Sequence, residues 1–314
     1  MQEKIDGNAP GRWSADAITS SPAGGWGWYL YGIMQPCRAG EPQPAIGAGL
    51  DGRAPVEMLR CGDLAAVVSR VPLAELGAEA VRVRLQDATW LEAMVRGHQR
   101  VVEAVHRQRT ILPAKFGNVY ASLEELLAAV EQTHDMLLAR IEQLEGCDEW
   151  GVRLYARYPT IRQRVTMEDT QVQRLQQDLA TTSPGRAYLL QRKLAAMLDT
   201  TTEQVLSDLA QAGYDQLARY AIAGHIGHQP DARRGSRDEV ELLRAAFLVS
   251  RSTASAFAEG IRRFTEGEEG LRCEYSGPWS PYSFVAAEED DSAWAGSGAN
   301  GVTLEERTHP EAQR

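Results

Sequence analysis

Cysteine is scarce in this sequence of 314 residues, and its spacing excludes several kinds of site. The four cysteines are Cys37, Cys61, Cys147 and Cys273, and no two of them are closer than 24 residues. A CxxC metal or redox motif is therefore absent. We expect the thiols to be reduced and buried, which is their usual state in a cytoplasmic protein.

Long apolar runs and clusters of positive charge are also missing. No stretch approaches the roughly 18 apolar residues of a membrane span. The charged residues Glu3, Lys4 and Asp6, with no apolar core beside them, argue against a signal peptide. The formal net charge is −10, whereas nucleic-acid binding needs clustered Lys and Arg. Residues 286–314 hold seven acidic and two basic side chains, so about half of the excess negative charge lies in this stretch.

The first half of the chain carries short strand patterns and two amphipathic helix patterns. Asp87 can cap the first helix, and Ser122 with Glu125 forms a capping box for the second. These elements predict a small sheet with two helices on one face, most simply a ferredoxin-like sandwich. The expected elements are strands at 28–34, 110–120 and 149–156, a hairpin over 56–71, and helices after Asp87 and Ser122.

The second half begins with a polar stretch and then repeats the mixture of helices and strands. Ser183-Pro184 predicts a helix start, and that helix is expected to run to about Gln211. Strands at 241–251 and 271–279 flank a helix that we expect Ser252 to cap.

The predicted fold class is α+β, with two domains that each have a small, largely antiparallel sheet covered by helices. Each domain is expected to be ferredoxin-like or a variant of that fold. The expected divisions are a disordered segment over 1–25, a first domain over 26–158, a junction over 159–182, a second domain over 183–286 and an acidic tail over 287–314.

Candidate chemical groups do not form a catalytic constellation. His225 and His228, with Asp231, offer too few ligands at usable spacing for zinc. His98 lies on an apolar helix stripe and is expected at the core boundary with one ring nitrogen hydrogen-bonded. Glu149 is interpreted as a solvated acid at a strand end. Lys115 next to Gly117 has no phosphate-binding loop, and Glu288–Asp291 lacks calcium-loop spacing, so we expect neither an enzyme nor a bound cofactor or metal.

Eight stretches, taken in order, resemble the GvpF/GvpL family of gas vesicle proteins. The similarity runs from about Tyr29 to Val285. The last stretch departs from the family's frequent GPWPPYSF, because Ser280 replaces the first central proline. The stretches are YLYGI, DLAAVVSRVPLAEL, WLEAMVRGHQRVVEAV, ILPAKFGNVY, EWGVRLYA, GRAYLLQRK, AAFLVSR and GPWSPYSF.

The resemblance implies a non-enzymatic accessory protein of gas vesicle formation, built from two α+β domains. It implies association with the small hydrophobic shell protein GvpA, with other accessory gas vesicle proteins as further partners, in the cytoplasm at the vesicle. It does not distinguish GvpF from GvpL. A different class of function also stays open, because paired ferredoxin-like domains can bind small molecules and act as regulators.

Residues of the shared motifs are expected to be structural anchors, since large aromatic side chains bury much apolar area. The segment 277–284 contains a literal PxxP, but its aromatic density and acidic flank favour packing over display as a free ligand. We expect it to continue the final strand and turn back across the protein. The expected anchor residues are Trp90, Phe116, Gly117, Trp150, Trp279, Tyr282 and Phe284.

Overall fold

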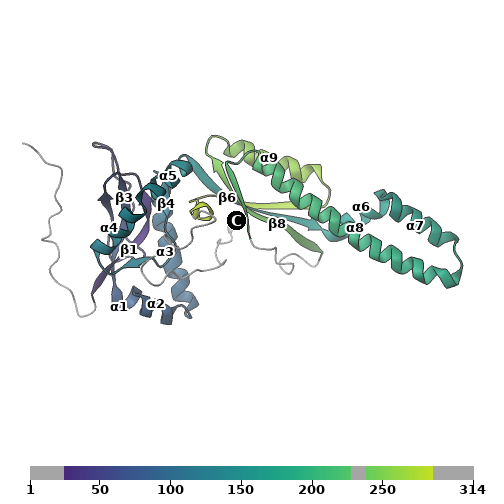
Figure 1. Ribbon diagram of the computed structural model, residues 1–314, viewed down its shortest axis with the longest axis horizontal. Coiled ribbons are helices and arrows are strands. Elements are labelled where there is room, and N and C mark those ends of the chain that lie inside the picture. The colour runs from purple at the N-terminus through teal and green to yellow at the C-terminus, as the bar shows by residue number, and fades with distance from the viewer. Residues whose placement is uncertain (1–24, 228–237, 286–314) are drawn as a thin grey trace, which may run out of the picture.

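The computed structural model describes residues 25–227 and 238–285 (Figure 1). The expectations for the first 24 residues, for the tail from 286 onward, and for His228 and Asp231 lie outside the described residues. The described chain forms two antiparallel sheets with helices packed on each, which confirms the predicted fold class.

The first sheet has the strand order β2-β3-β1-β4, with β5 also paired to β1. The hairpin of β2 and β3 forms as predicted, and Gly62 takes the positive φ of 69° that its turn requires. The single strand expected over 110–120 is instead two short strands separated by a loop. The bounds are β1 Trp26–Met34, β2 Val56–Cys61, β3 Leu64–Pro72, β4 Ile111–Pro113 and β5 Val119–Tyr120.

Helices cover both faces of the first sheet, so the expectation of helices on one face is wrong. Leu30 and Val68 point into a core shared with α4 and α5. Tyr29 and Val67 point the other way, into a core shared with α1, α2 and α3. Strands buried on both faces read as continuous apolar runs, which is why alternation did not reveal the second layer. The bounds are α1 Leu73–Leu76, α2 Ala78–Arg84, α3 Ala88–His106, α4 Leu123–Gln132 and α5 His134–Leu144.

A loop over residues 35–55 fills the place where a ferredoxin-like fold would have its first helix. Leu50 in this loop is buried, and its N–H donates to the Tyr31 hydroxyl at 2.7 Å. Arg100 of α3 donates to the carbonyl of Gly49 at 2.8 Å. The loop approaches α3 closely because Gly97 has no side chain: a Cβ there would lie 2.3 Å from the Leu50 oxygen.

The second sheet has the order β7-β8-β6-β9 and the β-α-β-β-α-β succession of a ferredoxin-like fold. The helices α8 and α9 cover one face of it. The strand expected to complete the first domain is β6, which pairs with β8 and β9, so that expectation is wrong. We propose that the first unit ends at Gly146, which closes α5 with a φ of 68°. The bounds are β6 Cys147–Arg157, β7 Ala223–Ile226, β8 Glu239–Ser250, β9 Leu271–Trp279, α8 Pro184–Ala218 and α9 Ala254–Gly267.

The segment expected as a junction, 159–182, is helical and lies within the crossover from β6 to β7. It forms most of α6 Tyr158–Glu168 and α7 Thr170–Thr181, which contact α8. We call α6, α7 and the N-terminal half of α8 the arm, because together they extend away from both sheets (Figure 1). The arm buries few large apolar side chains, and its polar composition therefore looked like a linker.

We predict that Gly97→Ala destabilises the protein although alanine is the better helix former. The new methyl group would strike the Leu50 carbonyl, and such overpacking costs about 1–3 kcal/mol in free energy of unfolding. The matched control is Gly185→Ala in α8, where a Cβ would meet no heavy atom within 4 Å. Urea denaturation should show a loss for the first variant and a neutral or slightly stabilising effect for the control. Equal effects would contradict the close approach of the loop.

Candidate functional site

Residues 280–285, which we call the strap, run from the end of β9 to the first unit. Ser280 and Pro281 are buried, and a short 3-10 helix follows over Tyr282–Phe284. Tyr282 packs against the α3 core of the first sheet, whereas Phe284 and Val285 pack against the α4–α5 core. The last described segment of the second unit therefore contacts both cores of the first.

Glu149 of β6 fixes the middle of the strap. Its Oε2 accepts a hydrogen bond from the Ser283 N–H at 2.8 Å, and its Oε1 accepts one from the Ser283 hydroxyl at 2.7 Å. The Glu149 residue is only 2% exposed, so its interpretation as a solvated strand-end acid is wrong. Burial raises the pKa of the Glu149 carboxyl, and the two hydrogen bonds from Ser283 oppose that rise.

Tyr282 enters a cluster of rings in the first unit. The centroid of its ring lies 6.1 Å from that of the His98 ring. The ring of Phe116 meets the His98 ring edge-on, also with 6.1 Å between the centroids. The Tyr29 hydroxyl accepts from the N–H of Gly117 at 3.1 Å, and its oxygen lies 2.9 Å from Nδ1 of His98. The predicted hydrogen bond to His98 is thus present.

His98 is fully buried, however, and does not lie at the boundary as expected. Burial lowers its pKa to about 4, so the imidazole is neutral near pH 7. A neutral ring is suited to packing among aromatic side chains, which is the position it occupies.

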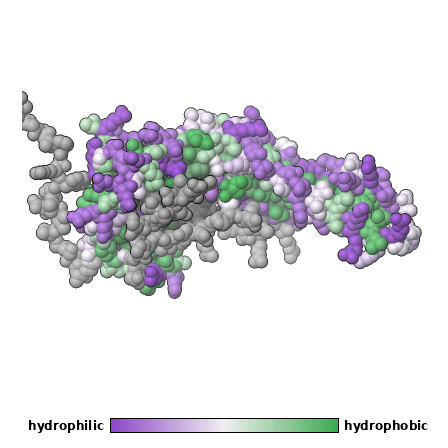
Figure 2. All heavy atoms as spheres, in the orientation of Figure 1, coloured by the Kyte–Doolittle hydropathy of each residue, from purple (hydrophilic) through white to green (hydrophobic). Residues whose placement is uncertain are grey.

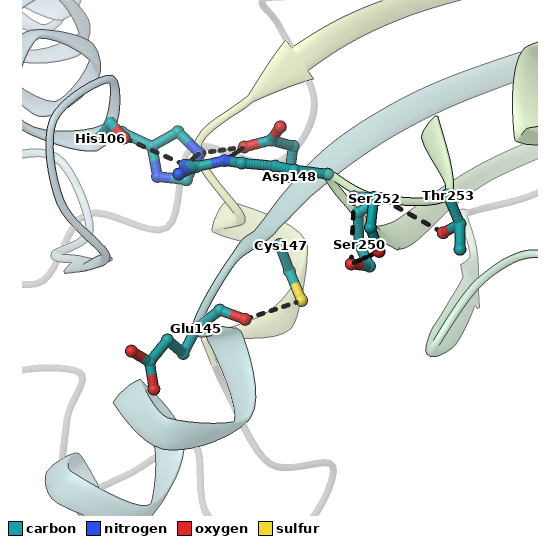
Figure 3. A network of polar contacts seen from close by, with 8 residues as sticks. His106, Glu145, Cys147, Asp148, Ser250, Ser252 and Thr253 are labelled. Atoms are coloured by element: carbon teal, nitrogen blue, oxygen red, sulfur yellow. Dashed lines mark hydrogen bonds and ion pairs between the residues drawn. The ribbon is translucent and has the colours of Figure 1, made fainter. Parts of the chain in front are cut away.

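A second polar contact joins the two units near the start of β6. His106 at the end of α3 places Nε2 2.8 Å from Oδ1 of Asp148, and Figure 3 shows these two side chains pointing toward each other. Arg251 donates to the same oxygen at 3.0 Å and to the His106 carbonyl at 3.1 Å. Burial raises the pKa of Asp148, but the hydrogen bonds from His106 and Arg251 outweigh it and hold the pKa below its usual value.

The seven motif residues divide into four places. Phe116, Gly117 and Tyr282 meet in the ring cluster. Trp150 and Trp279 lie at the end of the second sheet where β6 pairs with β9, and Phe284 packs on the α4–α5 core. Trp90 lies apart, half-buried near the start of α3 with Arg84 5.6 Å from its ring. Their role as energetic anchors stays a prediction.

The sequence interpretation missed the residues that connect the units. Glu149 and Ser283 are 134 residues apart, and Asp148 and Arg251 are 103 apart. One signal was available: Asp148 and Glu149 are adjacent carboxylates at the start of a strand pattern, and carboxylates that become buried need partners.

The other candidate groups do not come together. His225 is exposed on β7, and among residues 25–227 and 238–285 no cluster of three His, Cys, Asp or Glu side chains could hold a metal ion. In the same part of the chain, no helix is long and apolar enough to cross a membrane. An apolar cavity of about 10 Å³ lies between β6, α8 and α9, which is room for a single water molecule at most.

Comparisons of this sequence with a family model and with known proteins all match one family. The family model described as "Gas vesicle synthesis protein GvpL/GvpF" matches residues 27–286. Gas vesicle protein L from a Streptomyces species is 32% identical over 263 residues, covering 84% of this chain and 94% of that protein. Gas vesicle protein F from the same species is 26% identical, covering 82% and 98%.

Solved structures share the fold. The crystal structure of GvpF from Anabaena matches with a TM-score of 0.63 at 19% identity, covering 83% of this chain and 98% of that one. GvpF from Microcystis aeruginosa matches with a TM-score of 0.56 at 19% identity, covering 83% and 99%. At these identities, the two structures support the fold alone.

We predict that Glu149→Ala releases the strap and that Glu149→Gln retains it. A glutamine can accept from the Ser283 N–H and donate to the Ser283 hydroxyl, whereas alanine leaves both groups without a partner. Limited proteolysis should cut between 277 and 285 in Glu149→Ala and spare that segment in the parent and in Glu149→Gln. Cleavage there in the folded parent would refute the strap's role.

The parent and Glu149→Gln also test how the Glu149 carboxyl titrates. Since its pKa is raised above the usual 4.5, its protonated form stabilises the fold fully below that pH, and this contribution is lost as pH rises through the raised pKa. The free energy of unfolding of the parent, relative to Glu149→Gln, should therefore fall as pH is raised from 4.5. A pH-independent difference between the two proteins would contradict the buried carboxyl.

Proposed function

The chain belongs to the gas vesicle synthesis protein GvpL/GvpF family, and from this premise we propose that it binds the shell protein GvpA and helps to nucleate or assemble the vesicle. The family gives the chain a gas-vesicle-related role. The proposal adds the partner, a non-enzymatic mode of action and a location at the vesicle in the cytoplasm. Other accessory gas vesicle proteins are further proposed partners.

The observation that carries the proposal is the edge of the second sheet at β7. All four residues of Ala223–Ile226 are exposed, and among the described strands β7 is paired on one side only, with β8. The large apolar side chains Ile222 and Ile226 are 61% and 54% exposed. An unprotected strand edge with apolar side chains is a template for another strand.

This edge fits a small hydrophobic shell subunit. Such a subunit has apolar surface that would aggregate before it polymerises unless a partner covers it. Strand addition covers part of that surface with main-chain hydrogen bonds, and alternate side chains such as Ile226 supply apolar contacts. Release then needs no chemical step, because the next shell subunit can replace the edge with its own strand.

We predict that Ile222→Lys combined with Ile226→Lys weakens capture of GvpA. Lysine on an edge opposes strand pairing, and a loss of about tenfold in affinity corresponds to about 1.4 kcal/mol. The matched control is Met167→Lys, since Met167 is 59% exposed on α6, away from β7. The measurement is co-purification of GvpA with each variant and the vesicle yield of cells that carry it.

The parent and the control should retain GvpA and support vesicles, and the double variant should lose both. Equal capture by all three proteins would exclude β7 as the binding edge. No capture by the parent, or a normal vesicle yield after clean deletion of the gene, would exclude the proposed function itself.

A further inference from the structure

The long helix α8 has its charges separated by sign. It has 35 residues, which gives a length of about 52 Å at 1.5 Å per residue. Residues 184–198 contain Arg186, Arg192 and Lys193 and no acidic residue. Residues 199–218 contain four acidic residues, Asp199, Glu203, Asp208 and Asp215, and no basic one.

This distribution opposes what an isolated helix prefers. A helix is stabilised by acidic side chains near its N-terminus and by basic ones near its C-terminus, because of its macrodipole. The arrangement in α8 is the reverse, so the stability of the helix does not account for it. A partner surface with complementary charge would account for it.

Contacts inside the chain leave these charges available. Within residues 25–227 and 238–285, the side chains of Arg186 and Lys193 make no hydrogen bond or ion pair, and both residues are exposed. Among the described residues, the carboxylates of Asp208 and Asp215 accept hydrogen bonds only from the neutral amides of Gln204 and Gln211, at 2.8 and 2.9 Å. Of the charged groups on α8, Asp199 has an ionic partner, Arg162 of α6.

The spacing of the charges matches a second α8 that runs in the opposite direction. Arg186 and Asp215 lie equally far from the midpoint between Thr200 and Thr201, and so do Lys193 and Asp208. A two-fold axis at that midpoint therefore places each basic residue opposite an acidic residue of the other copy.

The surface around that axis permits close approach. Ala196, Thr200 and Ser207 are small and exposed, and the exposed Gln204 is held against Asp208 by its hydrogen bond. The N-terminal half of α8 lies in the arm, which extends away from both sheets (Figure 1). Figure 2 shows apolar surface among hydrophilic side chains near the end of the arm. In α8, the large side chains of Tyr188 and Leu189 are exposed.

We propose that two copies of this chain pair antiparallel along α8, with Arg186 and Lys193 of each copy facing Asp215 and Asp208 of the other. The interface is isologous, so each charge pair occurs twice. The arm of each copy lies along the C-terminal half of α8 of the other copy, and the two β7 edges remain outside the interface.

Charge reversal and rescue test the pairing. Sedimentation equilibrium should show a concentration-dependent dimer that weakens with added salt, because exposed charge pairs are screened. Lys193→Glu and Asp208→Lys should each raise the dimer dissociation constant about tenfold or more, and the combined variant should restore it toward the parent value. The matched control is Arg174→Glu, an equal charge change on the exposed side of α7, which should leave the dissociation constant unchanged.

A cross-link gives an independent readout. Thr200→Cys lies next to the proposed axis, so mild oxidation should link two copies through residue 200, whereas the parent and Leu189→Cys should stay unlinked. A monomer at all concentrations, a dimer indifferent to the two charge reversals, or a failure of the combined variant to recover would overturn the proposal. Binding of an acidic partner in place of a second copy would appear as the first of these outcomes.

Discussion

The buried contact between Glu149 and Ser283 is the interaction on which the arrangement of the two units depends. A carboxylate that is 2% exposed is costly unless its oxygens are hydrogen-bonded, and both oxygens here are bonded by one residue of the strap. That requirement fixes the strap against β6. Once it is fixed, Tyr282 and Phe284 must enter the two cores on opposite sides of the first sheet.

The strand β6 also connects the two units, because it contributes side chains to the cores of both. Its first residue, Cys147, is buried in a core of the first unit, and Val152, five positions later, is buried in the core of the second. Leu248 of β8 joins the same first-unit core. The two units therefore share apolar contacts as well as the polar group of His106, Asp148 and Arg251, and we regard them as one cooperative structure.

Local chemistry predicted the parts of this fold that depend on neighbouring residues. The hairpin over 56–71, the cap at Asp87 and the capping box of Ser122 and Glu125 are all present. The sheet to which β6 belongs could not be predicted, because its partners β8 and β9 follow about 90 to 130 residues later and strand composition does not specify a partner. The candidate site was predictable to a similar extent. Phe116 and Tyr282 lie in motifs that the family resemblance identified, whereas the burial of His98 and Glu149 depends on contacts between the two units.

The surfaces available for partners are those outside the contact between the two units. The contact between the units uses the strap, the start of β6 and the end of α3, and it includes neither the β7 edge nor the charged side chains of α8. Rigid coupling would keep these two surfaces in a fixed relation. Native-state hydrogen exchange tests this coupling most directly, by comparing the amides of β3 in the first sheet with those of β8 in the second. The account predicts that both sets exchange through one global opening with the same free energy, and exchange of either set while the other stays protected would contradict it.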